Sequence, residues 1–236
     1  MTRVSMRAFY EAGYAVADER MGRWRAIGAR SKAAHVEALC KRAGLTPRTV
    51  VEIGCGDGAV LAELTQRGWA VDGFELAENA ANRARERRVA RKVETFDGEH
   101  VPAAPDEYDL AVLSHVLEHV PDPRPLLTEA ARLAPHVVVE VPLEDNRSAR
   151  RPAKRRLAED AGHLHAFNRA DVLRLLTEAG LEPRAELTDP LPYEHHAFFA
   201  GAIKGGAKWA VRATVHRLGV AERLITLHYA VLATRA

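Results

Sequence analysis

The sequence has few cysteines, no long apolar run and almost no net charge. Its 236 residues include two cysteines, Cys40 and Cys55, too few for a disulfide framework or a four-thiolate zinc site. No apolar run approaches the roughly 18 residues of a membrane span, and the N-terminal segment lacks the apolar stretch of a signal peptide. A formal charge of +2 argues against general nucleic-acid coating. These absences predict a cytoplasmic protein that binds no membrane.

Positive charge is nevertheless concentrated in one segment. Residues 147–156 contain no acid and carry the basic side chains Arg147, Arg150, Arg151, Lys154, Arg155 and Arg156. The surrounding residues 145–162 lack periodicity and are predicted to form a long loop. Such a run is typical of a solvated loop. Binding of RNA or an acidic substrate is the alternative, although no aromatic side chain is interleaved for base stacking.

Strand-like and helix-like segments alternate along the rest of the chain, which is typical of a parallel sheet with crossover helices. Strands are predicted at Thr49–Ile53, Trp69–Phe74, Val93–Phe96, Tyr108–Ser114, His136–Val141, Ala185–Thr188 and Tyr229–Thr234. Helices are predicted over residues 20–44, Ala59–Arg67, Ala77–Arg88, Pro125–Leu133 and Arg169–Ala179, with two more inside 191–227. The fold class is therefore α/β, a doubly wound, Rossmann-like, mostly parallel sheet of about seven strands, and the length favours a single domain, 1–236.

A glycine-rich turn, Glu52–Gly58 (EIGCGDG), follows the first predicted strand. Gly54 permits the tight turn, Gly56 lets a ligand approach the backbone, and Gly58 lets the start of the helix pack closely. Such a turn aims free N–H groups at a ligand. Glu75, at the end of the second strand, is placed to accept hydrogen bonds from a ribose diol.

Two nucleotide cofactors fit this turn. The spacing Gly54-x-Gly56-x-x-Ala59 matches the relaxed fingerprint of dinucleotide binding. The extra glycine Gly58 and the acid Glu52, inside an apolar strand, count against a dinucleotide. A buried carboxylate needs a partner, and a cationic amine or sulfonium supplies one where a pyrophosphate does not.

The segment Glu52–Gly58 resembles motif I of class I S-adenosylmethionine-dependent methyltransferases. The likeness continues through Asp72–Glu75, Phe96–Gly98, Val116–Pro123 (VLEHVPDP) and His163–Phe167 (HLHAF), the last two being similar to ubiquinone-type O-methyltransferases. It covers roughly residues 48–188 together with the final strand. The family fold implies that this last strand is antiparallel. It also implies an N-terminal helical lid (1–44), a cofactor-binding core (45–188), a substrate-lid insertion (189–228) and the last strand (229–236).

The resemblance makes S-adenosylmethionine the expected cofactor. Its methionine amine is expected at Glu52, its ribose hydroxyls at Glu75 and its sulfonium near Ser114. Leu76 is expected to pack on the adenine, whose edge Asp97 and Gly98 would contact. The remaining cofactor-binding residues would be Gly54, Cys55, Gly56 and Gly58.

Histidines and one acid follow the fourth predicted strand. His115, Glu118 and His119 are spaced to share one face of a helix, and by the family fold His163 reaches the same edge of the sheet. A related branch, which methylates the 3′-terminal ribose of small RNAs, binds a divalent metal through Glu-x-x-Glu-His and a later His. Here His115 replaces the first of those acids.

Three interpretations of this group stay open. The first is a metal site of His115, Glu118, His119 and His163, whose imidazoles suit Zn, Fe, Ni or Mn better than Mg. The second is His115 or His119 as a metal-free catalytic base. The third is that Glu118 and His119 are structural residues of the subgroup.

The leading functional hypothesis is methyl transfer from S-adenosylmethionine to an oxygen of a small metabolite or natural product, by a monomer or homodimer. The alternatives are a metal-dependent RNA 3′-terminal ribose 2′-O-methyltransferase and a non-catalytic cofactor-binding partner protein. His195 and His196 are expected in a pocket wall or a lid. The isolated histidines His35, His100, His136, His216 and His228 are expected at the surface or in satisfied core positions.

Overall fold

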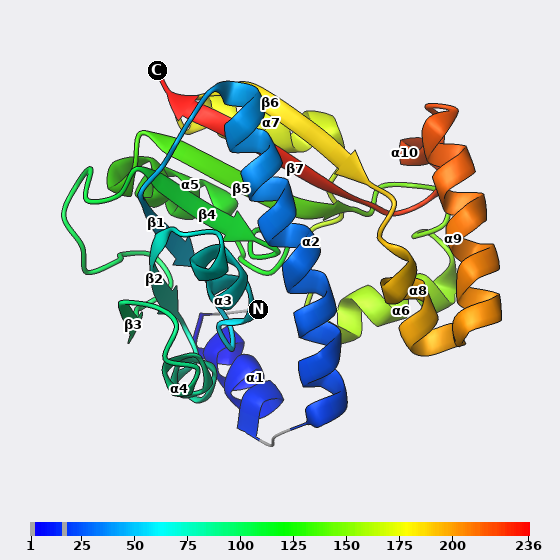
Figure 1. Ribbon diagram of the computed structural model, residues 1–236, viewed down its shortest axis with the longest axis horizontal. Coiled ribbons are helices and arrows are strands. Elements are labelled where there is room, and N and C mark those ends of the chain that lie inside the picture. Colours follow the sequence, from blue (N-terminus) through cyan, green and yellow to red (C-terminus); the bar gives the residue numbers. More distant parts are fainter. Residues whose placement is uncertain (1–2, 16–17) are drawn as a thin grey trace.

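The computed structural model describes residues 3–15 and 18–236 (Figure 1). Its centre is a sheet in the order β3-β2-β1-β4-β5-β7-β6. The strands are β1 (Thr49–Ile53), β2 (Ala70–Glu75), β3 (Lys92–Thr95), β4 (Leu110–Ser114), β5 (His136–Leu143), β6 (Leu181–Asp189) and β7 (Leu227–Arg235). The first five pair in parallel, and β7 runs antiparallel to both β5 and β6. The predicted doubly wound α/β fold, with its antiparallel last strand, is confirmed.

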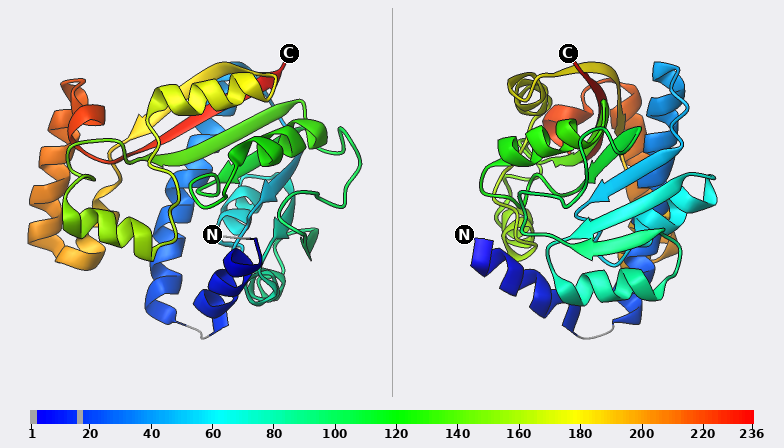
Figure 2. Two further views of the ribbon diagram at one scale, coloured as in Figure 1. Left: turned by 180° about the vertical axis from the view of Figure 1, so that it is seen from behind. Right: turned by 90° about the vertical axis from the view of Figure 1, so that its left-hand side faces the viewer.

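The helices are α1 (Arg3–Ala15), α2 (Glu19–Ala43), α3 (Ala59–Gln66), α4 (Glu78–Glu86), α5 (Pro123–Leu133), α6 (Pro152–Asp160), α7 (Arg169–Glu178), α8 (Tyr193–Ala200), α9 (Ala202–Arg217) and α10 (Ala221–Leu224). Helices α2 and α3 cover one face of the sheet, and α5 and α7 cover the other. The right-hand view of Figure 2 shows α2 and α5 on opposite sides.

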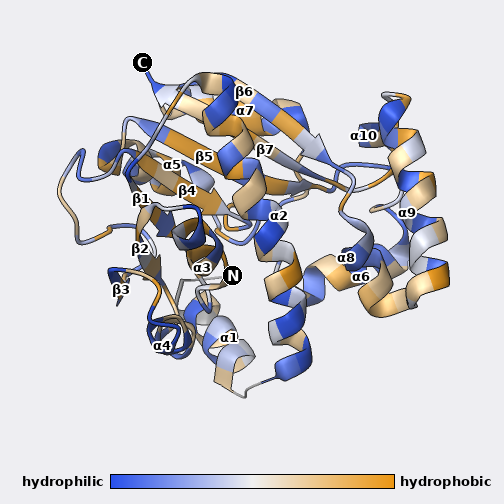
Figure 3. Ribbon diagram, viewed as in Figure 1, coloured by the Kyte–Doolittle hydropathy of each residue, from blue (hydrophilic) through white to orange (hydrophobic). Residues whose placement is uncertain are grey.

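The valine run of β5 shows why this strand is central. Val137 and Val139 face the cluster with α5 and α7, whereas Val138 faces the cluster with α2. Successive side chains of a strand point to opposite faces, so a strand covered on both sides is apolar at every position. In Figure 3 the central strands β4 and β5 are largely hydrophobic, whereas the peripheral helix α4 is hydrophilic.

Two expectations about the connecting segments are wrong. The predicted loop 145–162 contains α6, which begins at Pro152, where a missing backbone N–H costs nothing. No side chain of α6 is buried, so the helix does not pack into the core of the protein. The segment between β6 and β7 holds three helices rather than two. In the described part of the chain, no helix is long and apolar enough to cross a bilayer.

Candidate active site

The glycine turn lies between β1 and α3 and is fastened to β2. The backbone N–H groups of Gly54 and Cys55 donate to the Phe74 carbonyl at 2.7 and 3.1 Å. Gly54 has φ +77°, and a Cβ there would lie 2.6 Å from a methyl carbon of Val116. Only glycine therefore fits this position.

Gly58 has the packing role that was expected of it. A Cβ at Gly58 would lie 2.9 Å from the Cβ of Ala84 in α4. Gly54 and Gly56 line both cavities described below, whereas Gly58 lines neither. The close approach to Ala84 confirms that Gly58 permits tight packing at the start of α3, while its expected contact with the cofactor stays a prediction.

Glu75 ends β2 and is 7% exposed. Its carboxylate accepts N–H groups from Gly56 at 2.7 Å, Leu76 at 2.8 Å and Ala77 at 3.0 Å. Burial raises the pKa of Glu75, and these three donors oppose the rise. A carboxylate has about four acceptor directions, so one is left for a hydroxyl donor in the adjoining cavity.

A cavity of about 180 Å³ adjoins Glu75, with Leu76, Phe96 and Gly98 among its lining residues. Asp97 lies outside this lining. Its Oδ1 accepts the N–H groups of Glu99 and His100 at 2.8 and 2.7 Å, which closes the turn after β3. The structure therefore places Leu76 and Gly98 at the cavity and gives Asp97 a turn-forming role beside it.

Helix α1 covers this smaller cavity with Met6 and Tyr10. The helix is held by polar contacts to the core. Arg7 donates to the carbonyls of Leu76 and Phe96 at 2.9 and 3.3 Å. Glu11 accepts the first N–H groups of α4, at 2.7 and 2.9 Å, as an acid at a helix N-terminus should.

A larger cavity of about 480 Å³ lies on the other side of the glycine turn. Tyr14, Gly54, Gly56 and His115 line both cavities, so the two chambers adjoin. The wall of the larger one includes α2 and α8, whose Trp24 and His195 rings lie 3.8 Å apart between centroids.

The two neighbouring histidines of α8 lie differently. His195 lines the larger cavity. His196 is buried instead, with Nε2 3.3 Å from the Pro190 carbonyl. His195 therefore lies in the pocket wall, and His196 belongs to a lid that packs on the core. Both positions were expected for this pair.

Two residues on the floor of the larger cavity each have a buried polar atom without a hydrogen-bond partner in the described chain. Glu52 is 2% exposed, and its Oε2 accepts no hydrogen bond; the hydroxyl of Ser114 is also unpaired. Burial raises the pKa of Glu52 to about 8, against the opposing charge of Lys32. Since a buried carboxylate oxygen without a hydrogen-bond donor is costly, this floor suits a ligand that carries a cationic amine. Cys55 lines the same cavity and forms no disulfide.

His115 is not in a helix, contrary to the prediction. Residues 115–120 form a turn, and His115 has the left-handed φ of 59°, which is rare for a residue other than glycine. This conformation places its ring between two fully buried carboxylates. The Nδ1 lies 3.1 Å from Glu118 and the Nε2 lies 3.4 Å from Glu140.

The predicted metal set is divided. Ligand atoms of Glu118, His119 and His163 lie within 4.8 Å of one another, whereas His115 groups with Glu140 and His228. Apart from the ion-pair contacts of its Oε1 with His115 at 3.1 Å and His119 at 4.0 Å, neither oxygen of Glu118 has a hydrogen-bond partner in the described chain.

In both histidines of this cluster, Nδ1 faces an oxygen acceptor of the chain. The Nδ1 of His119 lies 3.3 Å from the Gly162 carbonyl, and that of His163 lies 2.7 Å from the carboxylate of Glu144. Metal-binding histidines are oriented in this way by acceptors on the opposite nitrogen. The donor set of one carboxylate and two imidazoles therefore fits a divalent transition metal.

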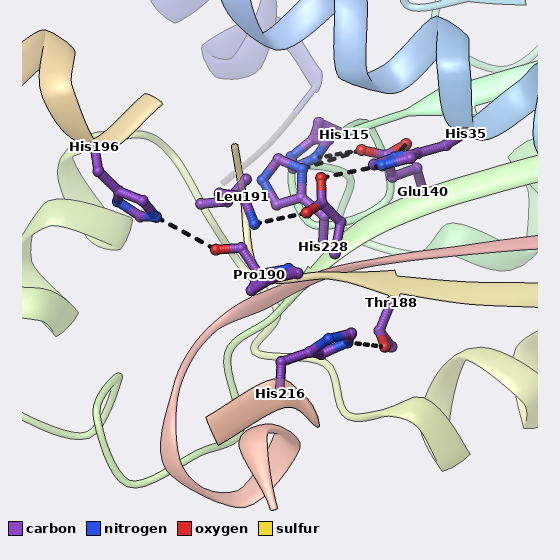
Figure 4. Close-up of polar contacts among 10 residues, drawn as sticks. His35, His115, Glu140, Thr188, Pro190, Leu191, His196, His216 and His228 are labelled. Atoms are coloured by element: carbon purple, nitrogen blue, oxygen red, sulfur yellow. Dashed lines mark hydrogen bonds and ion pairs between the residues drawn. The ribbon is translucent and has the colours of Figure 1, made fainter. Parts of the chain in front are cut away.

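The sequence analysis did not identify Glu140 and its histidine partners as a polar cluster. Glu140 in β5 is 1% exposed and contacts three histidines, His35, His115 and His228 (Figure 4). His35 and His228 were expected at the surface or in satisfied core positions; both are hydrogen-bonded, and they share Glu140 as a partner. The available signal was Glu140 itself. An acid in a strand covered on both faces needs a partner, as was argued for Glu52.

Comparison with known proteins identifies the family of this chain. A methyltransferase domain model matches residues 23–186. The chain belongs to the methyltransferase domain family. The ubiquinone biosynthesis O-methyltransferase of Aeromonas salmonicida (strain A449) is 33% identical over 98 residues, which are 39% of this chain and 41% of that protein. The Nitrosomonas europaea enzyme of the same name is 26% identical over 174 residues, 69% and 67% of the two chains. The chain thus matches about two fifths of the length of the first of these relatives.

Solved structures share the fold of this methyltransferase domain. A S-adenosylmethionine-dependent methyltransferase from Thermotoga maritima, a possible histamine N-methyltransferase by its description, matches with a TM-score of 0.66 and 19% identity, covering 98% of this chain and 100% of that one. Geranyl diphosphate C-methyltransferase from Streptomyces coelicolor A3(2) matches with a TM-score of 0.62 and 19% identity, covering 86% and 79%. At these identities the likeness establishes the fold of the methyltransferase domain and not its acceptor.

Proposed function

We propose that this methyltransferase-domain protein transfers the methyl group of S-adenosylmethionine to an oxygen of a small molecule. The observation that carries the proposal is the pair of adjoining cavities at the glycine turn, one beside Glu75 and the other over the unpaired groups of Glu52 and Ser114. A donor that bridges the two would present its reactive centre to the larger chamber. The names of the curated relatives, O-methyltransferases of ubiquinone biosynthesis, support oxygen as the acceptor atom.

In this proposal Glu75 binds the ribose hydroxyls and Glu52 binds the methionine amine. The amine supplies the donor that Glu52 lacks and favours its ionised form. Leu76 and Gly98 contact the adenine, with Asp97 at its edge. The other donor-binding residues are Gly54, Cys55, Gly56, Gly58 and Ser114, and Gly58 also permits close packing against Ala84.

The larger cavity is the proposed acceptor chamber. Its volume of about 480 Å³ is within the usual range for small-molecule sites. Lys32, His115, His195 and His228 line it, so it presents both cationic and neutral hydrogen-bonding groups to an acceptor. The segments expected as lids, α1–α2 and α8–α10, contribute Tyr14, Trp24 and His195 to the walls.

A divalent metal fits the cluster of Glu118, His119 and His163, with His115 turned toward Glu140 instead. When bound there, a metal would supply positive charge beside the acceptor chamber, which is also lined by His163. The proposal includes action as a monomer or homodimer and a cytoplasmic location. The two unpaired thiols of Cys40 and Cys55 suit a reducing compartment.

Calorimetric titration with S-adenosylhomocysteine, the product of methyl donation, tests the proposal. We expect micromolar binding to the unaltered chain and at least ten-fold weaker binding to Glu75→Gln, which loses a charge-assisted hydrogen bond. Glu78→Gln is the matched control, because Glu78 lies three residues away and pairs with Arg85 at the surface. Absence of binding to the unaltered chain refutes the proposal. Normal binding without turnover of any acceptor favours a non-catalytic cofactor-binding protein.

A further inference from the structure

Glu140 is the centre of a buried network that the proposed donor site does not use. It contributes one oxygen to His228 and the other to His35, and His35 in turn reaches Asp189 (Figure 4). These residues come from β5, β7, α2 and β6. The network thus joins four separate elements, and its member His228 lines the larger cavity.

The hydrogen bond between Glu140 and His228 determines which nitrogen of His228 is free. The Nδ1 of His228 lies 3.1 Å from Oε1 of Glu140. An ionised carboxylate only accepts hydrogen bonds, so this Nδ1 carries the proton. In the neutral ring, Nε2 then holds a lone pair, and His228 lines the larger cavity.

His35 holds the carboxylate from the opposite side. Its Nδ1 lies 3.0 Å from Oε2 of Glu140, and its Nε2 lies 3.1 Å from Asp189. Burial disfavours protonation of His35, but the two acids outweigh it and raise the pKa of His35 to about 9. A protonated ring between the two acids fixes Glu140 in its ionised form and in one orientation.

We propose that Nε2 of His228 is the general base that accepts the hydroxyl proton of the methyl acceptor, with Glu140 and His35 as positioning residues. This inference rests on the proposed function and narrows its acceptor to a molecule with an ionisable hydroxyl, such as a phenol or an enol. A base of this kind contributes when the nucleophile must lose a proton as it attacks.

The step balances as follows. The acceptor O–H bond breaks, and its proton moves to Nε2 of His228. A lone pair of the oxygen forms the new bond to the methyl carbon, whose bond to sulfur breaks. That electron pair stays on sulfur, so the sulfonium becomes a neutral thioether. The proton then passes from His228 to solvent, which restores the neutral ring bonded to Glu140.

The charges around His228 keep the resting ring neutral. The groups that face it are Glu140, His115, His195, Lys32 and Asp189. Burial and the His115 ring lower the pKa of His228 to about 4, against the opposing effect of Glu140. The lone pair is therefore present at neutral pH. Because a lasting imidazolium is disfavoured there, proton transfer should accompany methyl transfer rather than precede it.

Nuclear magnetic resonance of ¹⁵N-histidine-labelled full chain, saturated with S-adenosylhomocysteine, tests the geometry without turnover. The His228 signals are assigned by their loss in His228→Gln. We expect a neutral ring with the proton on Nδ1 at pH 7, and a change in that tautomer balance in Glu140→Gln. A protonated His228 at pH 7, or a proton on Nε2, overturns the proposal.

Turnover of a panel of phenols and catechols tests the role. Removing a general base costs typically 10²–10⁴-fold, so His228→Gln should lose at least 100-fold in kcat while its Kd for S-adenosylhomocysteine stays within two-fold. His136→Gln is the matched control, because His136 also bonds from β5 to β7 but at the other end of the strands.

The outcomes separate this proposal from the function on which it rests. Wild-type kcat in His228→Gln, or an equal loss in both variants, overturns the base assignment while leaving methyl transfer intact. Failure of the unaltered chain to bind S-adenosylhomocysteine refutes the proposed function itself. Binding without turnover of any phenol or catechol refutes the hydroxyl acceptor class.

Discussion

Replacing His35 by glutamine should change the pH dependence of stability. The His35 ring lies between Glu140 and Asp189, with its side chain 12% exposed. Burial opposes its protonation, yet the two acids raise its pKa from 6.5 to about 9. At about 1.4 kcal/mol per pH unit of pKa difference, the protonated ring contributes on the order of 3 kcal/mol to the free energy of unfolding.

The sign follows from the direction of the pKa change. Because the folded pKa lies above the unfolded value of 6.5, the contribution is complete below about pH 6.5. It disappears as the pH rises through about 9. The stability difference between the unaltered chain and His35→Gln should therefore shrink by on the order of 3 kcal/mol between pH 6 and pH 10.

Urea unfolding, followed by tryptophan fluorescence at five pH values from 6 to 10, measures this difference. His136→Gln is the control, because burial lowers the pKa of His136 and any pH dependence from that residue is confined to the acid side. A difference for His35→Gln that is constant from pH 6 to pH 10, or that grows with pH, would refute the reasoning.

Two further changes test the glycine turn and the metal cluster. Gly58→Ala should destabilise the fold by about 1–3 kcal/mol more than Gly68→Ala. Both glycines have positive φ, but a Cβ at Gly58 meets Ala84 at 2.9 Å and one at Gly68 meets nothing; equal melting temperatures would contradict this. Calorimetry of the chelator-treated chain should show binding of Mn²⁺ or Zn²⁺ that is at least ten-fold weaker in Glu118→Gln and unchanged in the surface variant Glu107→Gln. No metal binding by the unaltered chain would leave the cluster purely structural.

The order of strands and helices was predictable because it depends on local pattern. The valines of β5 and the glycines after β1 impose backbone preferences within a few residues. Their order along the chain then limits the topology, because crossover connections between parallel strands are right-handed. The cavity positions of Gly54, Gly56, Glu75 and Ser114 follow from that topology, since the ends of parallel strands meet at one edge of the sheet.

Helix α6 and the turn at His115 escaped prediction for opposite reasons. The α6 helix buries no side chain, and Leu157 is its one large apolar residue. Its apolar pattern is therefore short and easily missed. His115 lies in a segment with helical spacing, but its left-handed φ is imposed by the neighbouring structure. Contacts with the distant Glu140, by the backbone N–H at 2.8 Å and by Nε2 at 3.4 Å, outweigh the local preference there.

The sequence by itself therefore determined the sheet, the glycine turn and the acids that end the strands, because each depends on neighbours in the chain. Only the tertiary structure decided which histidines act together. His35, Glu140 and His228 are separated by 105 and 88 residues, and no local pattern links them. Antiparallel pairing of β7 with β5 and the packing of α2 on the sheet bring them within hydrogen-bonding distance, since a buried carboxylate must find its partners wherever the fold supplies them.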